Sequence, residues 1–101
     1  MRIIVMFDLP TGTSQDRKTY RAFRKLLLSE GFLMLQESVY SKLVINQTSV
    51  NLILKRIRKN KPTAGYVFIL TVTEKQYSKM EFLVGNVESN ILDTTERLVV
   101  L

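Results

Sequence analysis

The segment RIIVMFD, residues 2–8, is continuously apolar between its terminal Arg2 and Asp8. A run without alternation of polar and apolar side chains is typical of a central β-strand that is covered on both faces or buried by a partner. The strand is expected to end at Asp8, because the turn sequence Leu-Pro-Thr-Gly follows at residues 9–12. These seven residues therefore predict a sheet in which the N-terminal strand is central.

A helix and a hairpin are expected next. Thr13 and Asp16 form the pattern of a capping box, with Asp in place of Glu, and Gly31 supplies a stop, so a helix is predicted over residues 14–30. Residues 32–45 are rich in Val, Ile, Leu, Tyr and Phe, with an interruption by Gln-Glu-Ser. This composition predicts a hairpin, or one long bent strand.

A second helix and a further strand complete the pattern. Thr48 can cap a helix that reaches about residue 60, before Pro62, and residues 66–73 (YVFILTVT) predict another buried strand. The resulting order is β-α-β-β-α-β. It predicts an α+β, ferredoxin-like fold, in which an antiparallel sheet carries two helices on one face.

The C-terminal part is expected to extend this fold. Thr-Glu-Lys-Gln at residues 73–76 resembles a capping box for a short helix, and a polar stretch precedes the apolar RLVVL at residues 97–101. The last segment predicts a short extra strand, which should join a sheet edge of its own chain or of a neighbour. We therefore expect one ferredoxin-like domain over residues 1–101, with a C-terminal extension at about residues 74–101.

The composition excludes several kinds of chemistry. The chain has no cysteine and no histidine, so disulfides, thiolate nucleophiles and the usual zinc ligands are absent. Any catalysis must use carboxylates, hydroxyls, Lys, Arg or a hard metal ion. Because no apolar run reaches the roughly 18 residues of a membrane helix, and the N-terminus lacks the layout of a secretory signal, we expect a cytoplasmic protein without a membrane partner.

The positive charge is concentrated in the first part of the chain. Residues 1–61 hold twelve Lys/Arg against four Asp/Glu, whereas residues 62–101 hold three against five. A one-sided positive field attracts phosphate backbones. The alternative is a merely solvated surface, which normally has acids interleaved with the bases.

The two predicted helices gather these bases on their outer faces. On the first helix the bases fall within a sector of about 120° opposite the apolar face. We expect both helices to bind phosphates without reading sequence, and the candidate nucleic-acid-binding residues are Arg17, Lys18, Arg21, Arg24, Lys25, Lys55, Arg56 and Lys59.

Asp8 is the candidate metal ligand and catalytic residue. Mg²⁺ usually takes one or two carboxylates together with waters and phosphate, so one Asp is too few for a hydrolytic site. A symmetric homodimer would supply a second copy, and two facing aspartates could share one Mg²⁺. The alternative from the residues alone is that Asp8 caps the turn after the strand as an Asx motif, and composition favours this simpler role.

Five segments taken together point to a known family. They are DLPT at residues 8–11, RKTYR with FRK within residues 17–25, GF at 31–32, QESVYSK at 36–42 and LTVTEKQ at 70–76. As a set, they closely resemble the second CRISPR-associated protein of type II systems, and the likeness spans essentially the whole chain.

This resemblance implies a ferredoxin-like homodimer, described as a Mg²⁺-dependent endoribonuclease or endonuclease, whose metal aspartate corresponds to Asp8. It also implies a subunit that bridges two dimers of the CRISPR integrase while foreign duplex DNA is captured and inserted into the repeat array. In that complex the integrase is expected to cut and join, and this subunit to act as scaffold and DNA platform.

Three hypotheses describe the function. The first is a DNA-binding scaffold of CRISPR adaptation, with residual metal-dependent nuclease activity at paired Asp8 residues. The second is a free-standing, toxin-type, metal-dependent ribonuclease. The third is a module that binds single-stranded RNA by stacking bases on Tyr66 and Phe68 of its sheet, although the Gly-flanked consensus of such modules is absent.

Overall fold

The computed structural model describes residues 1–85 of the chain, and the elements alternate in the predicted order. In chain order they are β1 (Arg2–Asp8), α1 (Ser14–Ser29), β2 (Leu33–Gln36), β3 (Val39–Leu43), α2 (Gln47–Lys59), β4 (Tyr66–Val72) and α3 (Glu74–Tyr77). The extra strand predicted at residues 97–101 lies outside the described residues.

The N-terminal strand is central, as its sequence predicted. The sheet has the order β2-β3-β1-β4, and every neighbouring pair is antiparallel. Ile4 of β1 lies opposite Ser41 of β3 and Leu70 of β4. This arrangement, together with the βαββαβ order, confirms the α+β fold.

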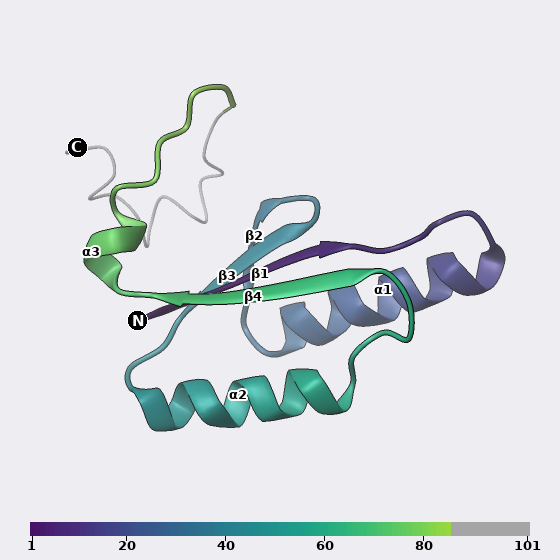
Figure 1. Ribbon diagram of the computed structural model, residues 1–101, viewed down its shortest axis with the longest axis horizontal. Helices are drawn as coiled ribbons and strands as arrows, with labels where there is room; N and C mark the ends of the chain where they lie inside the picture. Colours follow the sequence, from purple (N-terminus) through teal and green to yellow (C-terminus); the bar gives the residue numbers. More distant parts are fainter. Residues whose placement is uncertain (86–101) are drawn as a thin grey trace.

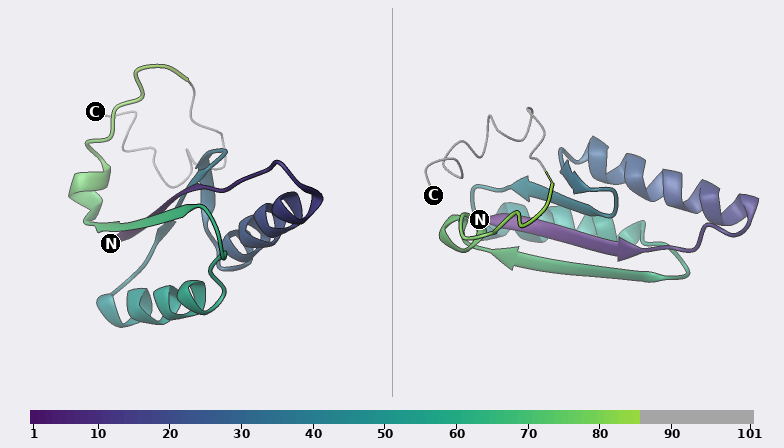
Figure 2. Two further views of the ribbon diagram at one scale, coloured as in Figure 1. Left: turned by 45° about the vertical axis from the view of Figure 1, so that its right-hand side comes forward. Right: turned by 90° about the horizontal axis from the view of Figure 1, so that it is seen from above.

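Helices α1 and α2 lie on the same side of the sheet (Figure 1), and Figure 2 shows this from two further directions. The side chains of β1 that point toward the helices are buried, and Phe7 joins the layers. Its ring centre lies 5.2 Å from that of Phe23 and 5.7 Å from those of Tyr20 and Tyr40. The apolar faces of both helices therefore meet one continuous core.

The ends of the helices follow local sequence signals, with one difference. The amide of Asp16 donates to Thr13 Oγ1 at 3.0 Å and the amide of Thr13 donates to Asp16 Oδ2 at 3.2 Å, which confirms the capping box of α1. The predicted cap of α2 is wrong: Asn46, not Thr48, accepts from the amide of Ser49 at 2.9 Å. Asn46 has the extended backbone of an N-cap, whereas Thr48 is already inside the first turn.

Strand β4 is not the buried strand that its composition predicted. Among residues 1–85 it is the edge strand beyond β1, and α1 and α2 cover only one of its faces. Tyr66, Phe68 and Leu70 are 65%, 62% and 50% exposed, while Val67 and Ile69 pack against the core. An apolar run on an edge strand thus leaves every second side chain on the uncovered face.

The sheet face away from α1 and α2 is called the open sheet face here. The strand register places six residues on this face in the C-terminal part of β1 and beside it: Met6, Asp8, Val39, Tyr66, Phe68 and Leu70.

The short helix α3 covers the other end of the open sheet face. The buried Tyr77 places its hydroxyl 3.3 Å from Ser41 Oγ, and the guanidinium of Arg2 lies 4.4 Å from the centre of its ring. Arg2 Nε also donates to a carboxylate oxygen of Glu74 at 2.9 Å. Arg2 therefore ties α3 to the sheet although its side chain is almost fully buried.

Candidate nucleic-acid interface

Helix α1 exposes its Lys and Arg side chains to solvent, as predicted. Phe23 and Leu27 are buried against the sheet, Tyr20 and Leu26 are partly buried, and all five candidate bases of α1 are exposed. The guanidinium of Arg17 donates to the carbonyl oxygen of Thr11 at 3.1 Å, which holds this side chain beside the turn after β1.

Helix α2 repeats this division. The predicted stripe of Val50, Ile53, Leu54 and Ile57 is buried, and the three candidate bases of α2 are exposed. The eight candidate bases of α1 and α2 are called the basic helix faces below. Both helices lie on one side of the sheet (Figure 1), so all eight of these exposed cations belong to the helix side of the molecule.

Arg56 differs from the other seven bases because it is engaged in an ion pair. Its Nε and Nη2 atoms donate to the two carboxylate oxygens of Glu30 at 2.7 and 2.8 Å. These hydrogen bonds hold the pKa of Glu30 below its usual value, against the opposing effect of burial, and they raise the pKa of Arg56. The pair joins the C-terminal cap of α1 to α2. The Arg56 guanidinium is therefore engaged in a contact between the two helices before any nucleic acid binds.

This pair makes a pH-dependent contribution to stability. A carboxyl whose pKa is lowered in the folded state stabilises that state above its usual pKa of 4.5, and this contribution is lost as the pH falls through the lowered pKa. We expect Glu30→Gln to lower the melting temperature by at most a few degrees near neutral pH, since the pair lies at the surface. Melting curves should show the difference shrinking as the pH falls below 4.5 and vanishing once Glu30 is protonated in the folded state as well.

A matched control is Glu37→Gln, because Glu37 is exposed and forms no ion pair within residues 1–85. A Glu30→Gln deficit that persisted unchanged in acid would contradict the assigned role of the ion pair.

Asp8 is the C-terminal residue of β1; it is exposed and lies opposite Tyr66 of β4. Gly65, with φ of +82°, lies directly against it, because a Cβ on Gly65 would stand 2.5 Å from the Asp8 carbonyl oxygen. This close approach fixes the backbone at Asp8. No hydrogen bond or ion pair engages the carboxylate within the described residues, so the alternative of an Asx cap is not formed there.

The surroundings of Asp8 are mostly apolar. It lies at a hollow of about 240 Å³ on the open sheet face, with Met6, Val39, Tyr66 and Phe68 among its neighbours. In residues 1–85 no three His, Cys, Asp or Glu side chains are grouped so that they could hold a metal ion. Within the described residues, Asp8 is therefore the single carboxylate at this hollow, whereas Mg²⁺ sites usually use one or two carboxylates together with waters and phosphate.

The structure also contains features that sequence patterns did not reveal. Arg2 and Glu74 are far apart in the chain and meet only through the fold, and the same holds for Glu30 and Arg56. A hollow between α1 and the loop after α2 has no sequence motif of its own. None of the helices within residues 1–85 is long and apolar enough to cross a membrane.

Comparison with known proteins places the chain in a family. The profile of the family described as CRISPR associated protein Cas2 matches residues 1–80. A CRISPR-associated endoribonuclease Cas2 of Treponema denticola is 56% identical over 101 residues, covering all of both chains. One of Streptococcus mutans serotype c is 50% identical over 101 residues, which are 100% of this chain and 93% of the relative.

A solved structure supports the fold. The crystal structure of Streptococcus pyogenes Cas2 at pH 6.5 aligns with a TM-score of 0.65 and 20% identity, covering 83% of this chain and 100% of the other. At that identity the likeness concerns the fold alone, and the family assignment depends on the sequence matches. The chain belongs to the CRISPR associated protein Cas2 family.

Proposed function

We propose that this protein is the DNA-binding scaffold subunit of a CRISPR adaptation complex, where it binds duplex DNA as a homodimer and bridges copies of the integrase. The observation that carries the proposal is the set of exposed cations on the basic helix faces, of which only Arg56 is in an ion pair within residues 1–85. The cations lie on two helices of the same side of the sheet (Figure 1), and cations that have no acidic partner favour contacts with phosphates. Such contacts position DNA without reading its sequence.

The test is assembly with the integrase. The purified full chain, mixed with the integrase and duplex DNA, should elute as one stable complex, and the DNA should dissociate as salt is raised. Failure to associate with the integrase, combined with RNA cleavage by the free protein, would favour the toxin-type ribonuclease. The names of the curated relatives, CRISPR-associated endoribonuclease Cas2, keep that activity as the alternative.

The open sheet face supports the proposed homodimer. Exposed aromatic and aliphatic side chains gather there, and apolar patches of this kind on small proteins commonly mark an interface. A second copy of the chain would cover them and would bring a second Asp8 toward the first. The segment 97–101 is proposed to pair across the chain boundary, at a sheet edge of the partner or of the integrase.

The paired Asp8 carboxylates would be the ligands for Mg²⁺. A single exposed carboxylate at this hollow, without a second one beside it in the described residues, suits an ion shared by two chains. Mg²⁺ bound there would neutralise phosphate charge and activate water toward a phosphodiester. In this arrangement each chain contributes one of the two carboxylates.

A second candidate function is binding of single-stranded RNA on the open sheet face. The rings of Tyr66 and Phe68 are both exposed there, with their centres 6.3 Å apart, and exposed aromatics on a sheet can stack bases. This candidate excludes the homodimer on the same face. Sedimentation therefore separates the two: a monomer that binds single-stranded RNA, and loses it in Phe68→Ala, would favour RNA binding.

A further inference from the structure

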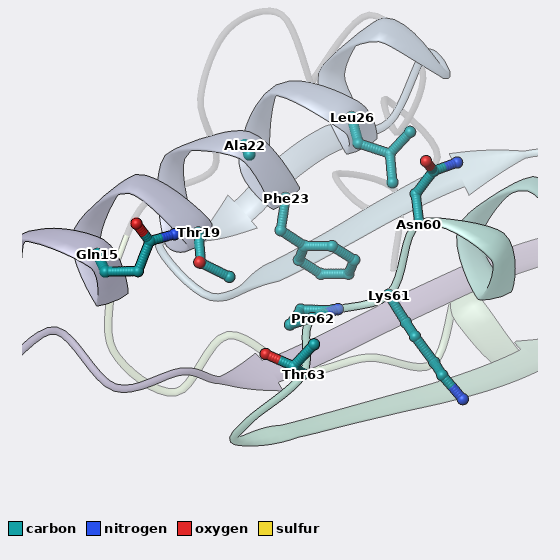
Figure 3. Close-up of a pocket in the computed structure, with 9 residues that line it drawn as sticks. All are labelled: Gln15, Thr19, Ala22, Phe23, Leu26, Asn60, Lys61, Pro62 and Thr63. Atoms are coloured by element: carbon teal, nitrogen blue, oxygen red, sulfur yellow. The ribbon is translucent and has the colours of Figure 1, made fainter.

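A hollow of about 420 Å³ separates α1 from the loop that joins α2 to β4. Figure 3 shows Gln15, Thr19 and Phe23 on the α1 side and Pro62 and Thr63 on the loop side. Its volume falls within the range of about 300–1,000 Å³ that is usual for ligand sites.

The lining combines an apolar floor with polar groups that have no partner. Phe23 is almost fully buried and presents only part of its ring to the hollow, beside Leu26. Around this floor, the side chains of Gln15, Thr19 and Thr63 form no hydrogen bond within the described part of the chain. These amide and hydroxyl groups can both donate and accept, as recognition of a flat heterocycle requires.

The hollow lies on the helix side of the sheet, away from the open sheet face. A dimer formed through the open sheet face would therefore leave it accessible. Lys61 extends from its rim (Figure 3), and Lys18 and Lys25 are exposed on α1, the helix that lines the other side of the hollow. A nucleic acid that contacts both α1 and the loop after α2 would lie over this opening.

We propose that this hollow binds one unpaired nucleotide of the nucleic acid held by the basic helix faces. The proposal rests on the proposed function, since the helices must first hold the phosphates. The base enters between α1 and the loop, contacts Phe23 and Leu26, and exchanges hydrogen bonds with Gln15, Thr19 and Thr63. Lys61 at the rim is the cation for the adjoining phosphate.

The polar and charged groups around the hollow favour a nucleotide over an apolar peptide side chain as its ligand. A pocket for a Leu or Phe anchor is expected to have few unpaired polar groups, because each one that a partner leaves unsatisfied costs free energy. Here hydroxyl and amide groups surround the floor, and Lys61 stands at the rim. An integrase side chain in the hollow is the competing outcome of the test.

The experiment compares a blunt duplex with the same duplex carrying short unpaired thymine tails. Wild-type protein should bind the tailed duplex about fivefold more tightly, which corresponds to the gain of roughly one net hydrogen bond. Ala22→Phe should remove this preference by filling the hollow, because Ala22 is an exposed lining residue on α1. Leu28→Phe, which adds the same ring at an exposed position of α1 outside the hollow, should keep the preference.

A second variant and a spectrum localise the effect. Thr63→Val removes one hydroxyl from the exposed loop without filling the space, and it should reduce the tail preference part of the way. The amide resonances of Thr19, Asn60 and Thr63 should shift on addition of tailed duplex and not of blunt duplex. Melting curves of all variants check that the fold is retained.

Equal affinity for the tailed and blunt duplexes would overturn the inference while leaving the proposed function intact. Retention of the preference in a folded Ala22→Phe protein would overturn it as well. Shifts of the same resonances by the integrase alone, and not by tailed DNA, would assign the hollow to a protein side chain. If wild-type protein bound neither duplex, the proposed function itself would be refuted, and this inference with it.

Discussion

Asp8→Asn should slow the proposed Mg²⁺-dependent cleavage of phosphodiesters by the isolated protein about 100-fold or more, if the paired Asp8 carboxylates hold the ion. A neutral amide is a poor ligand for a hard cation, and even the loss of a partner outside the ligand shell can cost about 10- to 100-fold. Asp8 is exposed and its carboxylate forms no hydrogen bond within the described residues, so the fold should survive. Cleavage rates with and without chelator, beside a melting curve, provide the measurement.

Glu37→Gln is the matched control for this change, since it removes one exposed carboxylate from the turn between β2 and β3. Its cleavage rate should stay at the wild-type level. Duplex binding should persist or tighten slightly in Asp8→Asn, because a negative charge is removed while the basic helix faces are untouched. If spacer integration by the complete complex failed in Asp8→Asn with fold and assembly intact, this subunit would contribute catalysis, and the scaffold proposal would have to be abandoned.

Replacing Arg21 and Lys25 together with glutamine should weaken binding of duplex DNA roughly 10- to 100-fold at low salt. The two positions are four residues apart and exposed on the outer face of α1, where one DNA backbone can contact both. For every phosphate that the variant no longer neutralises, the slope of log affinity against log salt should fall by about 0.9. Titrations at several salt concentrations measure both quantities.

Lys75→Gln with Lys79→Gln is the control for that pair. It removes the same charge from the region of α3, which lies at the far end of the sheet from the N-terminus of α1 (Figure 1). A comparable weakening in this control would show that net charge, and not the basic helix faces, governs binding. Strong dependence of wild-type affinity on base sequence would also contradict the platform, because phosphate contacts carry no sequence information.

Replacing Arg56 with glutamine should weaken binding of duplex DNA less than replacing Arg21 or Lys25, although the sequence pattern gives all three residues the same role. Its guanidinium already donates to both oxygens of Glu30, so a phosphate would have to compete with a carboxylate. Counting bases on a helical wheel cannot distinguish a free cation from a paired one when the partner lies on another element.

Features that depend on neighbours a few residues apart could be predicted from the amino-acid sequence. The capping boxes at Thr13 and Thr73, the buried stripe of α2 and the central place of β1 follow from local hydrogen bonds and side-chain periodicity. The position of Asp8 at the end of a strand follows from the same kind of signal. The cap of α2 was misplaced because Asn46 and Thr48 are both competent cap residues, and only the backbone of the preceding loop selects between them.

What each surface meets depends instead on the tertiary structure. β4 became an edge strand with exposed Tyr66 and Phe68 because the order of strands, which composition does not encode, left it without a second neighbour among the described residues. The contact of Arg2 with Glu74 spans 72 positions, and that of Arg56 with Glu30 spans 26. The hollow beside Phe23 likewise exists only because α1 and the loop after α2 stand apart. Contacts between distant segments depend on how the layers pack, and local propensity carries no information about that packing.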